Sequence, residues 1–439
     1  MSEREGSLTR RVARLVRGRD VSHGDRIDAE RFVRDWLGSY VAGSSASTGR
    51  ILDAYGADAG DLESRTFLAA ALSHVTETDD LHRSSVTHPG CVVVPVALLL
   101  GRHLEARGHA ILRAVLAGYD VMTRIGEALG PAHYRTFHNT ATAGVFGSAA
   151  AAASLLDLSE DRWVWALGSA GTQAAGLWQF NDEGAMSKPL HAGHAASAGL
   201  RAALLAAKGL TGAEAILEGD KGLFQALCPD ARPDAVLADT LGWKLPETSM
   251  KPYPCCRHVH PAIDAALQLR EALGDTRPAE VRVESYPAAL DVTDRPAPRT
   301  PHEARFSMQY AVASTLLHGR PGLETFEAGA IDDGRVRDLL THVTVGTDDS
   351  LAAAYPKRWG AHVSVVGNDG VRHRVVRESA AGDPDQPLDE AGLDAKVEGL
   401  FGWAGLETAR GRSLLRSCRG LVEDGPAVVL PFGTAVQRR

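Results

Sequence analysis

Lysine is scarce in this chain, with only seven lysines among 439 residues, so arginine supplies most of the positive charge. The formal net charge is −8. This balance gives no support to nucleic-acid binding, and an anionic ligand would need a local cluster of basic groups. We therefore expect no nucleic-acid partner.

Cysteine is also sparse, and the five thiols include no CxxC spacing. They are Cys91, Cys228, Cys255, Cys256 and Cys418. Adjacent cysteines are poorly placed to bridge each other, so reduced thiols in a cytoplasmic protein are expected. No apolar run reaches the roughly 20 residues that cross a bilayer. The Arg-rich N-terminus carries acidic residues and lacks an apolar signal core, which favours a frayed first helix over a targeting peptide.

Several nucleotide and cofactor motifs are missing. No GxGxxG follows a predicted strand, no GxxxxGK[S/T] occurs, and the spaced cysteines of an iron–sulfur cluster are absent. The sequence GSAG at 168–171 is not a G-x-S-x-G nucleophile elbow. We expect chemistry performed by side chains alone, with no cofactor and no metal.

The spacing of apolar residues in the first half of the chain predicts helices. At 44% hydrophobic and 23% charged residues the composition is that of a globular protein, and the length favours two domains. Helical apolar spacing dominates residues 26–220, and stretches 143–156 and 191–209 are rich in alanine and glycine. Glycine inside a helix costs about 1 kcal/mol, so compositional drift explains the alanines better than the glycines. Closely packed helices are predicted.

The pattern changes after about residue 270. Residues 279–285 and 341–346 alternate as strands do, and 361–377 predicts a hairpin around Asn-Asp-Gly. Residues 306–317 and 390–422 return to helical spacing. The predicted fold is mainly α: a large all-helical domain built from both termini (1–252 and 390–439) and an inserted smaller α+β lid domain (253–389). A cleft between the domains is where we expect the ligand site.

Two clusters of titratable residues precede helices in the first half. Residues 77–91 hold Glu77, Asp79 and His88, with His88 at the start of an apolar helix. A solvated loop with capping groups is the structural alternative. His138 begins the glycine- and alanine-rich helix, and the helix dipole could lower its pKa. A lone histidine is otherwise more often structural.

Two further clusters are rich in basic residues. Lys188 precedes the most alanine-rich helix, where burial would be costly unless the ammonium were paired or functional; a helix-start lysine that reaches water is the alternative. Arg257, His258 and His260 meet at a helix start suited to anions. Zinc held by Cys255, Cys256 and the two histidines is an alternative, but structural zinc sites usually use two separated ligand pairs. Tyr310 alone indicates only a core position.

Taken together, these segments resemble the MmgE/PrpD family of 2-methylcitrate dehydratase, cis-aconitate decarboxylase and iminodisuccinate epimerase. The matching stretches are THPGC (87–91), FHNTATAGVFGSAAAAASLL (137–156), SKPLHAGHAASAGL (187–200), GLTGAEAILEGDKGLF (209–224), KPYPCCRHVHPAID (251–264) and EARFSMQY (303–310). The resemblance implies a homodimer without metal or organic cofactor, with its active site between a helical and a lid domain. It implies catalytic roles for Glu77 or Asp79, His88, His138, Lys188, His260 and Tyr310, with Arg257 as a carboxylate anchor.

The acidic stretch departs from the decarboxylase pattern. Glu77 stands where the decarboxylase has aspartate, Leu81 follows the acidic pair in place of threonine, and the spacing to His88 differs by one residue. These changes argue against the decarboxylase's own substrate.

The expected function is a cofactor-independent lyase of the dehydratase (hydro-lyase) type that removes a proton next to a carboxylate of a small polycarboxylate such as 2-methylcitrate. His88 and His260 would move protons while Lys188 and Arg257 hold carboxylates. Decarboxylation of a cis-aconitate-like acid and epimerisation of an iminodisuccinate-like acid are the alternatives. A metal-binding module and a helical scaffold remain as non-enzyme alternatives.

Overall fold

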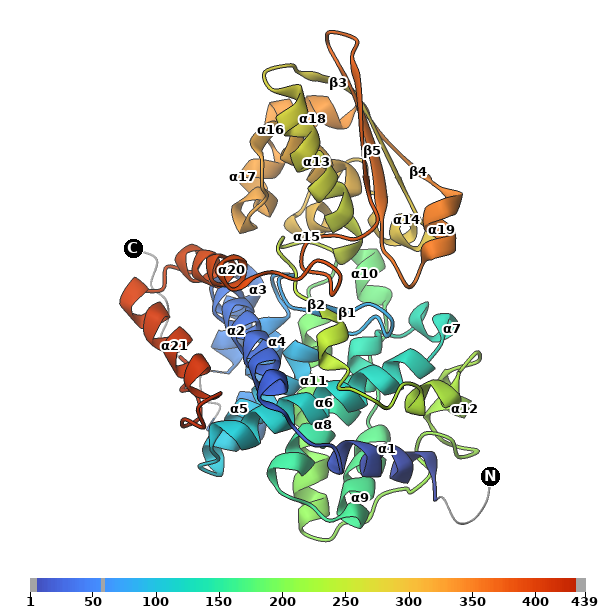
Figure 1. Ribbon diagram of the computed structural model, residues 1–439, viewed down its shortest axis with the longest axis vertical. Helices are drawn as coiled ribbons and strands as arrows, with labels where there is room; N and C mark the ends of the chain where they lie inside the picture. The colour runs from blue at the N-terminus through green and yellow to red at the C-terminus, as the bar shows by residue number, and fades with distance from the viewer. Residues whose placement is uncertain (1–5, 57–59, 432–439) are drawn as a thin grey trace. The chain divides into compact units, whose positions relative to one another are not determined.

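The computed structural model describes residues 6–56 and 60–431, in which the chain forms two compact units (Figure 1). Unit 1 comprises Met1–Val75, Asp79–Thr248 and Glu390–Arg439, and unit 2 comprises Thr76–Thr78 and Ser249–Asp389. The mainly α class expected from the sequence is confirmed. The expected domain boundaries and the lid role of the smaller part remain predictions, because compactness does not show which segment moves or folds alone.

Unit 1 is helical. Its elements are α1 (Leu8–Arg17), α2 (His23–Ser45), α3 (Ser47–Tyr55), α4 (Leu62–Ser73), β1 (Leu81–His82), α5 (Pro89–His103), α6 (Gly108–Ala128), α7 (Pro131–Tyr134), α8 (Asn139–Leu155), α9 (Glu160–Gly171), α10 (Gln179–Glu183), α11 (Lys188–Ala207), α12 (Leu223–Leu227), η1 (Pro233–Leu237), η2 (Leu245–Glu247), α20 (Glu390–Trp403) and α21 (Thr408–Gly420). Helix α1 confirms the expected first helix, while residues 1–5 of that segment lie outside the described part of the chain.

Helix α8 lies at the centre of unit 1, where α5, α6, α9 and α11 pack around it. Small residues make this packing close. A Cβ added at Gly199 of α11 would lie 2.3 Å from the Val145 carbonyl oxygen, and one at Gly147 would lie 2.7 Å from Met122 Cβ. The expectation that interspersed glycines serve close helix packing is confirmed.

The C-terminal helices return to the N-terminal part of unit 1. Helix α20 packs on α2, and Figure 1 shows α20 and α21 (red) beside α2 (blue). Arg34 of α2 forms ion pairs with two residues of α20, since its guanidinium lies 2.9 Å from Asp394 and 2.8 Å from Glu390. The side chain of Arg34 is 2% exposed, so these ion pairs are partly shielded from water.

Unit 2 combines a sheet with short helices. Its elements are β2 (Thr248–Ser249, beginning on the last residue of unit 1), η3 (Arg257–Val259), α13 (His260–Leu273), β3 (Pro278–Ser285), α14 (Pro287–Thr293), α15 (Pro301–Arg305), α16 (Met308–His318), η4 (Leu323–Phe326), α17 (Ala328–Ile331), α18 (Gly334–Leu340), β4 (Val343–Thr347), α19 (Asp349–Ala354), β5 (Ala361–Gly367) and β6 (Arg372–Arg377).

The sheet of unit 2 has the order β4-β3-β5-β6, with β3 parallel to β4 and the other pairs antiparallel. The hairpin expected over 361–377 is confirmed, with Val365 paired to His373 across β5 and β6. Alternate residues of β5 are buried, and α13 packs against β5 and β6. The alternating apolar pattern therefore marks the face that the helix covers.

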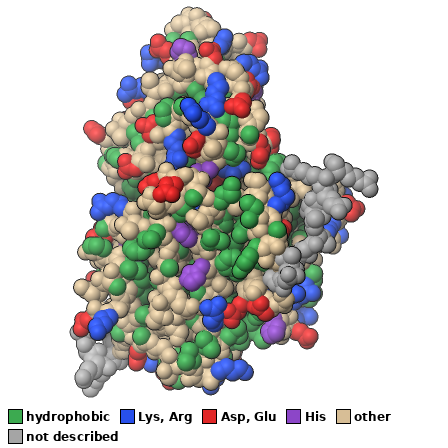
Figure 2. Space-filling model, turned by 180° about the vertical axis from the view of Figure 1, so that it is seen from behind, with side chains coloured by type: hydrophobic (Ala, Val, Ile, Leu, Met, Phe, Trp, Pro, Cys, Tyr) green, Lys and Arg blue, Asp and Glu red, His purple; other side chains and the backbone are tan. Residues whose placement is uncertain are grey.

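Charged side chains of both signs are interspersed on the face shown in Figure 2. Among the described residues, no helix has both the length and the apolar character needed to cross a bilayer.

Candidate active site

Unit 1 gathers three histidines and a tryptophan around His138. The His138 ring centroid lies 5.6 Å from that of His74, 6.3 Å from His88, 5.4 Å from His191 and 4.7 Å from Trp178. The predicted positions are confirmed: His88 immediately precedes α5, and His138 immediately precedes α8. Helix starts therefore bring residues distant in sequence to one place.

Asp79 links two of these histidines. Its Oδ2 lies 2.7 Å from His74 Nδ1 and 3.3 Å from His88 Nδ1. All three side chains are buried. A buried carboxylate in this position can orient the rings and stabilise a proton held on either one.

The backbone fixes the tautomer of His88. Its Nδ1 lies 2.6 Å from the carbonyl oxygen of Asp80, and a carbonyl can only accept a hydrogen bond. His88 Nδ1 is therefore the donor, and in the neutral ring Nε2 carries the lone pair that takes up a proton. This arrangement suits a general base.

Asp80 anchors the loop that precedes α5. Its carboxyl accepts hydrogen bonds from Tyr119 Oη at 2.6 Å and from the Gly90 amide at 3.0 Å. Burial nevertheless raises the pKa of Asp80 to about 8, because desolvation outweighs these hydrogen bonds. A Cβ on Gly90 would meet Tyr119 Oη at 2.8 Å and Asp80 Oδ1 at 2.9 Å, so glycine is needed for this approach.

His138 and His191 are held neutral. Their Nδ1 atoms are 3.2 Å apart, so one ring donates and the other accepts. Burial lowers the pKa of His138 well below 6.5, and the nearby His74 and Lys188 lower it further. The same causes lower the pKa of His191 to about 4. The lowered pKa agrees with the direction expected for His138, but burial rather than the helix dipole is the largest cause.

Lys188 begins α11 and its side chain is buried, at 7% relative exposure. Its positive charge acts on His138 and His191, as well as on Cys91. The alternative that Lys188 reaches water from the helix start is therefore wrong. Cys91 is fully buried, and its thiol donates a hydrogen bond to the His88 carbonyl oxygen at 3.2 Å. Burial raises the pKa of this thiol well above its ordinary value.

Glu77 belongs to unit 2. It has a positive φ of 58°, and its carboxylate pairs with Lys251 Nζ at 3.1 Å. Lys251 also donates to the Glu77 carbonyl oxygen at 3.3 Å. Both side chains are buried, which makes this a structural ion pair of unit 2 as well as a candidate functional group.

The remaining predicted residues also lie in unit 2. The guanidinium of Arg257 forms an ion pair with the buried carboxylate of Asp383. His260 begins α13, where its Nε2 lies 3.2 Å from the Cys255 carbonyl oxygen. Tyr310 is buried on α16 and donates to the Thr325 carbonyl oxygen at 2.6 Å, and burial raises its pKa to about 12. Catalytic roles for these three remain predictions.

Sequence reasoning missed His74 and His191. His74 precedes Asp79 by five residues and follows α4, and His191 lies one turn after Lys188 on α11. The spacing of i and i+3 on a predicted helix could have indicated His191. His74 had no such signal, because the turn that aims it at Asp79 depends on tertiary packing.

Comparison with known proteins assigns the family. Residues 11–235 match the MmgE/PrpD N-terminal domain, and residues 253–416 match the MmgE/PrpD C-terminal domain. The chain belongs to the MmgE/PrpD family.

Curated relatives of this family member are named cis-aconitate decarboxylases. The human protein is 27% identical over 422 residues, covering 89% of this chain and 87% of its own length. The mouse protein is 28% identical over 345 residues, covering 75% and 70%. One from Aspergillus terreus is 30% identical over 217 residues, covering 46% and 44%.

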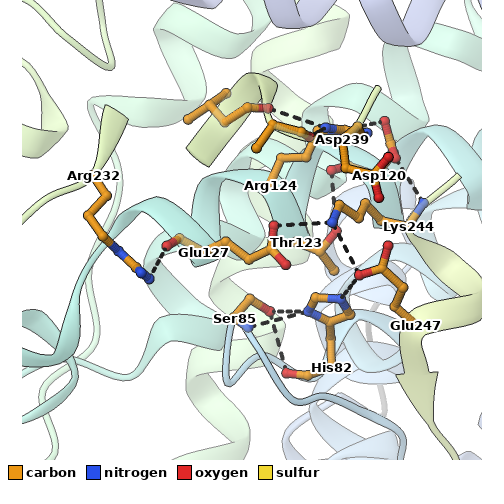
Figure 3. Close-up of polar contacts among 12 residues, drawn as sticks. His82, Ser85, Asp120, Thr123, Arg124, Glu127, Arg232, Asp239, Lys244 and Glu247 are labelled. Atoms are coloured by element: carbon orange, nitrogen blue, oxygen red, sulfur yellow. Dashed lines mark hydrogen bonds and ion pairs between the residues drawn. The ribbon is translucent and has the colours of Figure 1, made fainter. Parts of the chain in front are cut away.

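A second polar network lies in unit 1 of this MmgE/PrpD protein. Figure 3 shows Lys244 between Glu127 and Glu247, with Nζ–O distances of 3.4 and 3.1 Å, and His82 Nε2 lies 3.7 Å from Glu247. Burial raises the pKa of Glu247, but His82 and Lys244 lower it more, so its net pKa falls. This network links η2 to α6 through the two carboxylates that Lys244 contacts. The Lys244 ammonium is the positive charge between these carboxylates.

Three groups of described residues bring three possible metal-ligand atoms within 4.8 Å of one another. They are His74–Asp79–Cys91, His82–Glu127–Glu247 and Glu284–Asp348–His362. Cys255, Cys256, His258 and His260 form no such group among the described residues. His258 instead stacks on Trp359 and lies 2.6 Å from the Tyr286 hydroxyl, which argues against the zinc alternative at this segment.

Proposed function

We propose that this protein is a lyase that decarboxylates a small, cis-aconitate-like polycarboxylate with its own side chains. The observation that carries the proposal is the buried set of His88, Asp79, His138 and Lys188. The names of the relatives favour decarboxylation over the dehydration expected from the sequence. Because Glu77 and Leu81 depart from the decarboxylase pattern, we propose as substrate an acid related to cis-aconitate. Cis-aconitate itself is the first compound to test.

The chemistry follows from what decarboxylation requires. When the carbon–carbon bond to a carboxylate breaks, carbon dioxide leaves and the electron pair remains on the substrate. A neighbouring double bond can accept that pair. The reaction is completed when a protonated side chain delivers a proton to a carbon atom of the substrate. His88, oriented by Asp79 and the Asp80 carbonyl, is the proposed proton carrier.

Lys188 is the proposed electrostatic group. An ammonium in a buried site stabilises a substrate carboxylate and the charge that develops as the bond breaks more strongly than one in water. Of neutral His138 and His191, the ring whose Nδ1 accepts keeps its N–H on Nε2 and can donate a hydrogen bond without adding positive charge. We further propose that His260, Tyr310 and Arg257 contribute from unit 2 and that the protein acts as a homodimer in the cytoplasm.

The test is an assay of the purified protein, with and without EDTA treatment, on cis-aconitate, citrate, 2-methylcitrate and iminodisuccinate. Carbon dioxide release and proton NMR distinguish decarboxylation from dehydration, and optical rotation detects epimerisation. We expect carbon dioxide release from cis-aconitate or a close analogue. Water loss from 2-methylcitrate without carbon dioxide release would replace the proposal with the dehydratase function.

Site assignment is tested with the substrate so identified. We expect Lys188→Ala and His88→Asn each to reduce kcat by about 10²-fold or more. Lys208→Ala, at the exposed residue that follows α11, and His109→Asn on the surface serve as matched controls. Retained turnover in both Lys188→Ala and His88→Asn would reject the assignment, and His260→Ala tests the contribution of unit 2.

A further inference from the structure

Arg305 of unit 2 has no assigned role, although its side chain is only 12% exposed. It is the last residue of α15, and its carbonyl oxygen accepts a hydrogen bond from the Cys256 amide at 2.9 Å. This contact fixes the Arg305 backbone against the loop that leads to His260. The backbone of Arg305 is thus held both by its helix and by the neighbouring loop.

The charge of Arg305 is weakly compensated. Its nearest carboxylate among the described residues is that of Glu327 at 3.8 Å, and the Glu327 side chain is 51% exposed. The buried Arg305 Nε has no hydrogen-bond partner in the described part of the chain. Burial lowers the pKa of the guanidinium, although Glu327 and Glu77 oppose this. The carboxylate of Glu77 is itself engaged by Lys251 at 3.1 Å.

Other buried arginines show how this chain normally compensates a guanidinium. Arg124 forms an ion pair with Asp120 at 2.9 Å and donates to the carbonyl oxygens of Ala238 and Asp239. Arg34 has three carboxylate partners. Arg257, which the sequence suggested as the carboxylate anchor, is matched by the buried Asp383. Arg305 is therefore built differently from these three.

A largely buried guanidinium whose carboxylate neighbour is distant and half-exposed is unfavourable for folding, so its presence points to an anion that the folded protein binds. We propose that Arg305 is a carboxylate-binding residue, which takes one carboxylate group of a small polycarboxylate. This inference deepens the proposed function, because it names a specificity residue for the same substrate class. The planar guanidinium can bind a carboxylate through two parallel hydrogen bonds, which lysine cannot do.

The test compares Arg305→Met and Arg305→Lys with the wild-type chain by isothermal titration calorimetry. The probes are citrate, its uncharged trimethyl ester and inorganic sulfate. We expect Arg305→Met to weaken citrate binding by roughly tenfold or more and Arg305→Lys by less. The ester should bind neither the wild-type protein nor Arg305→Met. Sulfate binding that equals citrate binding would assign the site to inorganic anions and overturn the proposal. Arg282→Met, at an exposed arginine of β3, is the control, expected within about twofold of wild type.

Thermal unfolding without ligand separates a binding role from a structural one. Because the pair of Arg305 with half-exposed Glu327 compensates its charge only weakly, Arg305→Met should unfold at the same temperature as wild type or higher, while citrate no longer raises its midpoint. A midpoint many degrees lower would overturn the inference and make Arg305 a structural residue. So would unchanged citrate binding in Arg305→Met.

Turnover measured in parallel keeps the two proposals distinct. Wild-type citrate binding that depends on Arg305, without turnover of any acid, would leave the inference standing and reject the lyase function. Turnover with an unchanged KM in Arg305→Met would reject the inference and leave the function standing. Failure of the wild-type protein to bind or convert any polycarboxylate would overturn both.

Discussion

His258 lies in the core of unit 2, where its ring stacks on Trp359 with centroids 4.2 Å apart. Burial lowers its pKa to about 3, and the charges of Arg257 and Lys251 add to the shift. In the unfolded chain the histidine returns to its ordinary pKa of about 6.5. Between these values, only the unfolded state binds the proton, so acid destabilises the folded protein.

The variant His258→Phe keeps the ring and removes the titration. The stability of the wild-type protein should fall relative to this variant by about 2 kcal/mol between pH 7 and pH 5, since each pH unit below about 6.5 costs about 1.4 kcal/mol. Urea unfolding at several pH values measures the difference. Parallel stability curves for the two proteins would contradict the depressed pKa.

Asp79 offers a test of the acid–base set at single-residue scale. The variant Asp79→Asn removes the charge shared by His74 and His88 while keeping the size of the side chain. We expect kcat to fall by about 10²-fold with a smaller change in KM, and the acidic limb of the pH–rate profile to move. Asp424→Asn on the surface is the control. An unchanged pH profile in Asp79→Asn would show that the carboxylate is only structural.

The same residues show where sequence reasoning stops. His88, His138 and Lys188 could be found because each begins a helix that the apolar spacing predicts. The sequence could not show which of Glu77 and Asp79 joins the histidines. The backbone of Glu77 is left-handed, and its carboxylate pairs with Lys251. That turn is set by tertiary packing, which local sequence does not encode.

At the scale of elements, α8 and α11 owe their close approach to glycine. The Gly199 position faces backbone, with Ala149 N 2.6 Å and the Val145 carbonyl oxygen 2.3 Å from an added Cβ. Backbone atoms cannot rotate away as a flexible side chain can. The helix pair must therefore separate if any larger residue replaces Gly199.

We expect Gly199→Ala to destabilise the protein by about 2 kcal/mol or more, although alanine favours helix by about 1 kcal/mol. Gly399→Ala in α20 is the matched control, because an added Cβ there meets nothing within 4 Å. That variant should be stabilised by up to about 1 kcal/mol. Chemical denaturation measures both, and equal effects at the two positions would contradict the close-packing argument.

Element prediction succeeded where one periodic pattern dominates. The alternation in 361–377 predicted the β5–β6 hairpin, and the spacing in 144–156 predicted most of α8. The short helices α14, α15, α17 and α19 were not predicted, because a few residues carry no full helical period.

At the scale of the whole chain, the sequence predicted that the C-terminal helices rejoin the N-terminal ones, and α20 does pack on α2. Periodicity could not show which charges hold them. Lys396 of α20 pairs with Asp35, and Arg34 bonds to Glu390 and Asp394. These contacts join residues more than 350 positions apart, so the fastening is visible only in three dimensions.

Arg34→Met tests this fastening. The change leaves buried Glu30 without its guanidinium, while Glu390 and Asp394 keep only Arg31 and Arg419. We therefore expect a loss of about 3 kcal/mol and earlier proteolysis within α20 and α21. Arg201→Met, which breaks the exposed pair with Glu63, should cost less than about 1 kcal/mol. Urea unfolding with limited proteolysis and mass spectrometry reports both effects. If Arg34→Met were as stable as Arg201→Met, the return of the C-terminal helices would rest on apolar packing alone, since the ion pairs would contribute no net stability.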